Sequence, residues 1–229
     1  MKENILNTVL IDFHQQTFRN ITGPSKSDEF DDLTDNPEAR AYAHRAADAH
    51  RLKLNISELD YDAIHYVFLN SSTKPTRFSD GSFPVWYGSR DLKTTFYETI
   101  FHWKKTYFDA PHFPNSPRIQ RGIRRVFTVK CDAALIDLRE RKLTGTDSAS
   151  YTETRRIGSN YHQDYPGLLT QSARMPTGEN IVIFKKGVLS SPKHHDDYLY
   201  EYDQITKKIS VKQANSRTQI LILDKDAYD

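Results

Sequence analysis

The chain has 229 residues, of which 27% are charged and 12% are aromatic, and its formal net charge at pH 7 is +2. This length suits one domain, so we expect residues 1–229 to form a single domain. The small net charge argues against a dedicated nucleic-acid binder. The aromatic share argues against a disordered chain, because Phe and Tyr side chains supply bulky core material.

Cysteine usage and hydrophobicity narrow the class of protein further. Cys131 is the only cysteine, which excludes an intrachain disulfide and a cysteine-based zinc site. It ends an apolar run typical of a strand, so we expect a buried, inert thiol. Polar residues interrupt the apolar ones near the N-terminus, so we expect no signal peptide, and no run approaches membrane-spanning length. We therefore expect a cytoplasmic protein without a membrane partner.

Helices are predicted mainly in the first half of the chain. A helix should begin at Asp35-Asn36-Pro37 and end near residue 54, because proline suits the first turn and the alanines that follow favour propagation. We expect about residues 1–60 to form a helical N-terminal part. A strand over 64–69 should follow, and then a polar loop and a short strand over 85–88.

A second helix is predicted from Leu92 to about Tyr107, with Asp91 as its cap. Glu98 lies on the flank of this helix, away from its apolar face, so it should point toward a sheet edge or a cleft. The apolar face is formed by residues at helical spacing, namely Leu92, Phe96, Ile100 and Trp103.

The second half of the chain is predicted to consist mostly of strands. A strand pair is expected over 123–131 and 134–138, and the Ser/Thr-rich stretch over 144–160 is expected to be a loop. Later strands are separated by polar turns, and we place them at 181–184, 198–202, 209–212 and 219–223. Helices early and strands late indicate an α+β fold rather than a repeated βαβ unit.

Three side chains with complementary chemistry lie at the edges of successive elements. Arg77 lies in a polar connector, Tyr87 ends the short strand, and Glu98 lies in the helix that follows. A fixed cation, an aromatic face and a carboxylate are what an enzyme needs to hold an anionic nucleotide and stabilise a sugar cation. Each residue also has an ordinary structural interpretation, as a surface arginine, a core tyrosine, and a helix glutamate paired with His102 or Lys105.

At these residues the chain resembles the RES domain family, which is named for its Arg, Glu and Ser. The resemblance is strongest over 76–184 and is carried by Thr76-Arg77-Phe78-Ser79-Asp80, Val85-Trp86-Tyr87-Gly88-Ser89, Thr94-Thr95-Phe96-Tyr97-Glu98, Gln171-Ser172-Ala173-Arg174 and Glu179-Asn180-Ile181-Val182. It implies a fold similar to ADP-ribosyltransferases, with mixed or antiparallel sheets that form an NAD cleft and helices packed around them. It also implies a toxin of a bacterial toxin–antitoxin pair with an activity that consumes NAD.

The resemblance implies roles for these residues in an NAD site. Arg77 would clamp the pyrophosphate with its planar fork, a task that lysine performs less well, and Tyr87 would border the nicotinamide. Glu98 would stabilise an oxocarbenium-like transition state, and no general acid is needed because nicotinamide leaves as a neutral molecule. Ser172 would hydrogen-bond in the NAD pocket, although a turn hydroxyl is its ordinary interpretation. Further candidates nearby are Arg174 and Asn180.

Three functions remain open from the sequence. The first is cleavage of the nicotinamide–ribose bond by an NAD glycohydrolase or phosphorylase, with water or inorganic phosphate as the acceptor and a cognate Xre-like helix-turn-helix antitoxin as the inhibitor. The second is mono-ADP-ribosylation of a protein, because cleft shape and loops choose the acceptor. The third is an RNA-binding or translation-inhibiting module that uses the basic segment Arg118–Arg125 and aromatic stacking.

NAD is expected as a substrate, with no prosthetic group and no metal. The motif His194-His195-Asp196-Asp197 resembles a metal site, but adjacent residues of an extended chain do not readily face one ion. No glycine-rich dinucleotide loop follows a predicted strand, which argues against a Rossmann enzyme.

Overall fold

One eight-stranded sheet organises the molecule, in the order β1-β2-β5-β4-β3-β6-β7-β8, with β1 also paired to β3. The computed structural model describes residues 9–22, 36, 38–39, 42, 57–69, 74–103, 119–216 and 218–224. The strands are β1 (Leu10–Thr22), β2 (Trp86–Ser89), β3 (Ile119–Asp137), β4 (Gly167–Gln171), β5 (Glu179–Ile183), β6 (Leu189–Asp203), β7 (Lys208–Gln213) and β8 (Gln219–Asp224). β3 and β4 are parallel, and the remaining pairings are antiparallel. The predicted α+β class with a largely antiparallel sheet is confirmed.

Five of the eight strands close into a ring. β1 pairs with β3 from Leu10 opposite Ile136 to Thr22 opposite Arg124, and its other edge meets β2 where Phe18 lies opposite Ser89. The strands β1, β2, β5, β4 and β3 therefore form a ring, and β6, β7 and β8 extend from the far edge of β3. A closed ring leaves few unpaired backbone groups at a strand edge. Every strand of the ring contributes to one buried apolar cluster, which includes Phe13, Trp86, Phe127, Val129, Leu135, Leu169 and Ile181.

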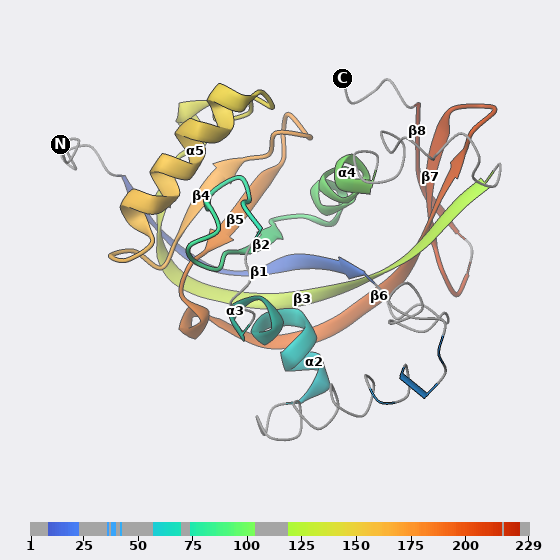
Figure 1. Ribbon diagram of the computed structural model, residues 1–229, viewed down its shortest axis with the longest axis horizontal. Helices are drawn as coiled ribbons and strands as arrows, with labels where there is room; N and C mark the ends of the chain where they lie inside the picture. Colours follow the sequence, from blue (N-terminus) through green and yellow to red (C-terminus); the bar gives the residue numbers. More distant parts are fainter. Residues whose placement is uncertain are drawn as a thin grey trace.

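The long strands β3 and β6 curve through the molecule, and helices cover both of their faces (Figure 1). Helix α4 (Leu92–Trp103) and helix α5 (Ser148–Tyr161) lie on one side, and α2 (Glu58–Asp60) and α3 (Tyr66–Leu69) lie on the other. The remaining short turns of helix are η2 (Tyr61–His65), η5 (Arg139–Arg141) and η6 (Lys186–Val188). Among the described residues, no helix is long and apolar enough to cross a membrane.

Helix α4 agrees with its sequence prediction. Asp91 caps it, because the Asp91 carboxylate accepts a hydrogen bond from the Thr94 amide over 2.8 Å. The predicted apolar face packs on β3, β6 and β7, and its buried members are Phe96, Ile100 and Trp103. The last predicted turn, beyond Trp103, lies outside the described residues.

The segment predicted as a strand over 64–69 is helical, so that prediction is wrong. Ser57 caps α2 by accepting a hydrogen bond from the Asp60 amide over 3.0 Å. The chain continues through a π-helical turn that buries Ala63 and Ile64, and the Trp86 indole donates to the Ala63 carbonyl over 2.8 Å. A short apolar run fits a strand and one buried helix face equally well. Here the segment is helical and packs its apolar side chains against the ring of strands.

The stretch over 144–160 also differs from its prediction. It contains helix α5, which Asp147 caps by accepting from the Ser150 amide over 2.9 Å. Serine and threonine favour loops in general, but Thr154 is buried and its hydroxyl donates to the Ser150 carbonyl of the preceding turn over 3.1 Å. Ile157 fixes the helix on the sheet, because it is part of an apolar cluster with Phe78 and Val182.

Three further predictions need correction or lie outside the description. Residues 10–22 form a strand, so the N-terminal part is not helical throughout. The predicted strand pair over 123–138 is the continuous strand β3, because polar residues such as Asp132 alternate outward without interrupting it. Strand β4 was not predicted. The helix predicted from Asp35 to residue 54 lies almost wholly outside the described residues.

Gly158 permits the contact between α5 and the segment that carries Arg77. A methyl group at Gly158 would lie 1.8 Å from the Phe78 carbonyl oxygen, which is a backbone atom and cannot rotate away. At a solvent-exposed position within a helix, replacing Gly by Ala stabilises the helix by about 1 kcal/mol. Here we expect Gly158→Ala to reduce the free energy of unfolding by about 1–3 kcal/mol, because the added atom forces the two backbones apart.

Urea denaturation measures this effect, and Gly187→Ala is the matched control because nothing lies within 4 Å of a methyl group at Gly187. Equal stability of the Gly158→Ala and Gly187→Ala proteins would contradict the close packing of α5 on Phe78.

Candidate active site

The Glu98 carboxylate is held by two neutral donors from other elements. Its Oε1 atom accepts one hydrogen bond from the Ser172 hydroxyl and one from the Asn180 side-chain amide, each over 2.6 Å. Glu98 comes from α4, Ser172 follows β4, and Asn180 lies in β5. The structure therefore brings together three of the predicted site residues. None of the described residues donates a hydrogen bond to Oε2, so this oxygen can accept one from a ligand.

Ser172 is the turn hydroxyl of its ordinary interpretation, and it also contacts Glu98. Its side chain is 1% exposed, and its hydroxyl accepts hydrogen bonds from the Arg174 and Met175 amides, each over 3.1 Å. The Ser172 amide donates to the Gly178 carbonyl over 2.8 Å. One hydroxyl thus fixes the turn after β4 and donates its own proton to Glu98.

Asn180 has a defined side-chain orientation. Its Oδ1 atom accepts from the Ser89 hydroxyl over 3.0 Å, and its backbone lies between Ser89 of β2 and Thr170 of β4 in the sheet. The hydroxyl of Ser89 donates to the oxygen, so the amide nitrogen faces Glu98. The position of Glu98 is therefore set by the ring of strands itself.

Tyr87 supports the segment that carries Arg77. Its hydroxyl lies 2.8 Å from the Thr76 hydroxyl and accepts from the Phe78 amide over 3.0 Å. Burial raises the pKa of the Tyr87 phenol to about 12, so the hydroxyl keeps its proton at neutral pH. The hydroxyl is thus used within the protein, and only the ring of Tyr87 remains for contact with a ligand.

Part of the Arg77 guanidinium is also used within the protein. Its Nη2 atom donates to the Leu143 carbonyl and, over 3.1 Å, to the Gly145 carbonyl. Its Cζ atom lies 5.5 Å from the centre of the Tyr151 ring. Arg77 therefore fixes the connection into α5 and can direct its other nitrogens toward a ligand.

Tyr151 and Arg174 complete the site, and Tyr151 was not among the residues predicted from the sequence. The Arg174 guanidinium carbon lies 3.2 Å from the centre of the Phe101 ring. Burial lowers the pKa of Arg174 below its ordinary value, whereas the charge of Glu98 and a hydrogen bond with Tyr151 act in the opposite direction. A helix prediction over 148–161 would have placed Tyr151 and Arg155 one turn apart on the same face and revealed this cluster.

The basic residues proposed for an RNA-binding module are mostly paired on the sheet. Arg121 contacts Glu201 over 2.7 Å and Arg125 contacts Asp197 over 3.2 Å, while Arg124 donates to the Thr22 hydroxyl. Arg118 lies outside the described residues. These pairings reduce the positive charge available to a phosphate backbone.

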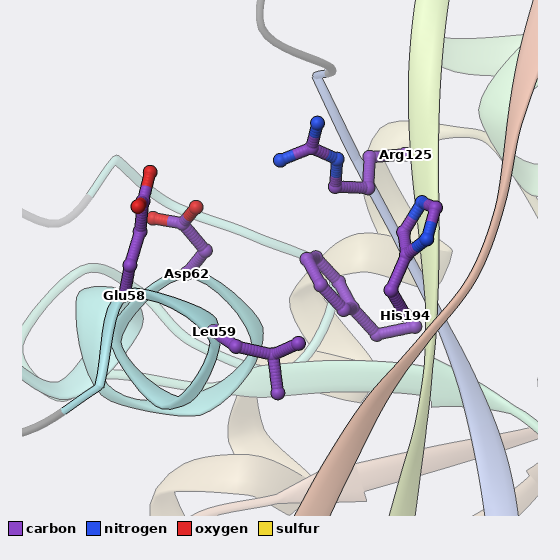
Figure 2. Close-up of a pocket in the computed structure, with 6 residues that line it drawn as sticks. Glu58, Leu59, Asp62, Arg125 and His194 are labelled. Carbon is purple, nitrogen blue, oxygen red and sulfur yellow. The ribbon is translucent and has the colours of Figure 1, made fainter.

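A cavity of about 250 Å³ lies between α2 and the strands β3 and β6. Figure 2 shows Glu58 and Asp62 on its helical wall and Arg125 and His194 on the strand side. Val126 of β3 packs under α4, so its neighbours Arg125 and Phe127 face the opposite side of the sheet. This cavity is therefore separated by the sheet from α4, which carries Glu98. His194 contacts Asp197 over 3.0 Å, and the described residues contain no group of three potential metal ligands.

Comparison with protein families supplies one match. The family model of the RES domain matches residues 43–203, which include Arg77, Tyr87, Glu98, Ser172 and Asn180. No curated protein matches the chain.

The hydroxyl of Tyr87 can be tested separately from its ring. Tyr87→Phe leaves the buried Phe78 amide without an acceptor, so we expect the free energy of unfolding to fall by about 1–3 kcal/mol. Urea denaturation measures the change. Tyr161→Phe is the matched control, because Tyr161 packs against the same apolar cluster and its hydroxyl makes no hydrogen bond with a described residue. Equal losses in the two proteins would contradict a supporting role for the Tyr87 hydroxyl.

Proposed function

The chain belongs to the RES domain family, and on that premise we propose that it is a toxin that cleaves the nicotinamide–ribose bond of NAD. The observation that carries this proposal is the Glu98 carboxylate. Two neutral donors orient its Oε1 atom without cancelling its charge, and its Oε2 atom remains available within the described part of the chain. An oriented carboxylate of this kind suits a reaction that develops positive charge on a sugar ring.

The chemistry requires one carboxylate and an acceptor. As the glycosidic C–N bond breaks, its electron pair moves to the nicotinamide nitrogen and neutralises the positive charge of the ring. The ribose carbon becomes cationic, Glu98 stabilises it, and Oε2 accepts a hydrogen bond from a ribose hydroxyl. An oxygen of water or inorganic phosphate then bonds to the ribose carbon, and water releases a proton to solvent. NAD is thus a substrate, not a prosthetic group.

We propose that NAD binds in a cleft like that of ADP-ribosyltransferases, and we match each part of NAD to residues of suitable chemistry. The pyrophosphate would lie near Arg77, which keeps donors beyond those used for Leu143 and Gly145. The nicotinamide would contact the ring of Tyr87, because the hydroxyl of this residue is engaged with Thr76 and Phe78.

A partner that inhibits the enzyme follows from this chemistry. An enzyme that drains NAD is harmful in the cytoplasm of its own cell, so we propose that a helix-turn-helix antitoxin of the Xre type occupies the NAD cleft. A carboxylate of the antitoxin would pair with Arg77 in place of the pyrophosphate. Full NAD affinity in the purified complex would exclude this mode of inhibition.

Incubation of the purified protein with NAD, with and without phosphate, tests the activity through chromatography of the products. We expect free nicotinamide, and Glu98→Gln should lower its rate of release by at least about 100-fold, because an amide lacks the charge that stabilises the sugar cation. Glu153→Gln is the matched control on an exposed position of α5. Wild-type turnover in a folded Glu98→Gln protein would contradict the proposal.

Arg77→Lys tests the pyrophosphate contact. A lysine keeps the charge but loses the planar fork, so we expect KM for NAD to rise by about tenfold or more. The same variant should also lose stability to urea, because the carbonyls of Leu143 and Gly145 lose a donor. An unchanged KM would show that Arg77 supports the fold alone.

A further inference from the structure

Arg174 is a second guanidinium beside Glu98, and the proposed chemistry has not yet used it. The turn that carries it is fixed by Ser172, whose hydroxyl accepts from the Arg174 amide and donates to Glu98. Phe101, on which the guanidinium stacks, lies three residues after Glu98 in α4. Residues with this spacing are neighbours on one helix face. The carboxylate and the guanidinium are therefore positioned side by side by the same two elements.

The hydrogen bonding of Arg174 is incomplete. Its Nε atom is buried and has no partner among the described residues. The side chain is held by stacking on Phe101 and by its contact with Tyr151 instead of a full set of acceptors. A buried donor without an acceptor destabilises the protein, and an anionic ligand that accepts a hydrogen bond from Nε would offset this cost.

Positive charge accumulates around Tyr151. The Cζ atoms of Arg77 and Arg155 each lie 5.5 Å from the centre of its ring, and the Tyr151 side chain also interacts with Arg174. Arg155 is committed to the fold, because its Nε atom donates to the Thr76 carbonyl over 2.9 Å. The charge of Glu98 acts to raise the pKa of Arg174, and the charge of Arg77 acts to lower it. Positive charge is thus in excess at this position, as an anion-binding site requires.

We propose that Arg174 and Tyr151 form the principal diphosphate-binding contact of the site. Arg77 contributes to the same contact through the nitrogens that Leu143 and Gly145 leave free, whereas the guanidinium of Arg174 donates to no carbonyl of the described residues and lies beside Glu98. The identity of its natural ligand, the diphosphate of a dinucleotide, rests on the proposed function. Ser172 would then couple the two ends of the ligand, because one hydroxyl positions both the ribose-facing carboxylate and the phosphate-facing guanidinium.

Calorimetric titration with inorganic diphosphate tests the site without any turnover. We expect Arg174→Met to weaken binding by about tenfold or more. Arg174→Lys should recover part of this loss at low salt, because it keeps the charge without the planar fork. Arg121→Met is the matched control: it removes the same charge from a position on β3 that is paired with Glu201. Tyr151→Phe, which keeps the ring, should also weaken binding.

The inference is overturned if the wild-type chain does not bind diphosphate, or if Arg174→Met binds it as tightly as Arg121→Met. If Arg174→Met does not fold, Arg174→Lys decides, and wild-type affinity in that variant at both low and high salt overturns the inference.

Steady-state kinetics with NAD separate this inference from the proposed function. An Arg174 variant with a raised KM and a nearly unchanged kcat supports a binding role. If the wild-type chain binds diphosphate through Arg174 but releases no nicotinamide, the anion site stands and the proposed function fails. If Arg174→Lys and Arg174→Met both cleave NAD with the KM of the wild-type chain, the proposed function stands and Arg174 is not the contact.

Discussion

The hydrogen bonds that the Glu98 Oε1 atom accepts from Ser172 and Asn180 join helix α4 to the ends of β4 and β5. Other contacts at this junction depend on the same close approach. A methyl group at Gly178 would lie 2.3 Å from the Thr94 hydroxyl, so the turn after β4 reaches α4 only because this residue is glycine. Asp91 holds Thr94 at the start of the helix. The position of the carboxylate is therefore fixed by the packing of α4 against this turn and by two side chains of the sheet.

The cationic side of the site is assembled in a different way. Arg77 lies in a segment without regular structure. The Tyr87 hydroxyl, the Arg155 side chain and the close approach of Gly158 hold the residues on either side of Arg77. The strand β2, the connector and α5 thus meet at the residues adjacent to Arg77. This explains how a loop residue can hold a guanidinium in a defined place, which catalysis by positioning requires.

The sequence predicted those site residues that lie close together along the chain. Arg77, Tyr87 and Glu98 lie in succession, and the cap and apolar face of α4 are local patterns that suffice to place Glu98 on the flank of that helix. The pairing of β1 with β3 joins residue 22 to residue 124, and no local pattern carries information on such a distant contact. Tyr151 was missed because threonine and serine in α5 have low helix propensity, while burial against the sheet stabilises that helix.

The most direct measurement is a crystal structure with an NAD analogue in which carbon replaces the glycosidic nitrogen, so that the bond cannot be cleaved. The account predicts a ribose hydroxyl within about 3 Å of the Glu98 Oε2 atom and diphosphate oxygens in contact with Arg174. A ribose remote from Glu98, or a ligand bound in the cavity between α2 and β3 on the opposite side of the sheet, would contradict it.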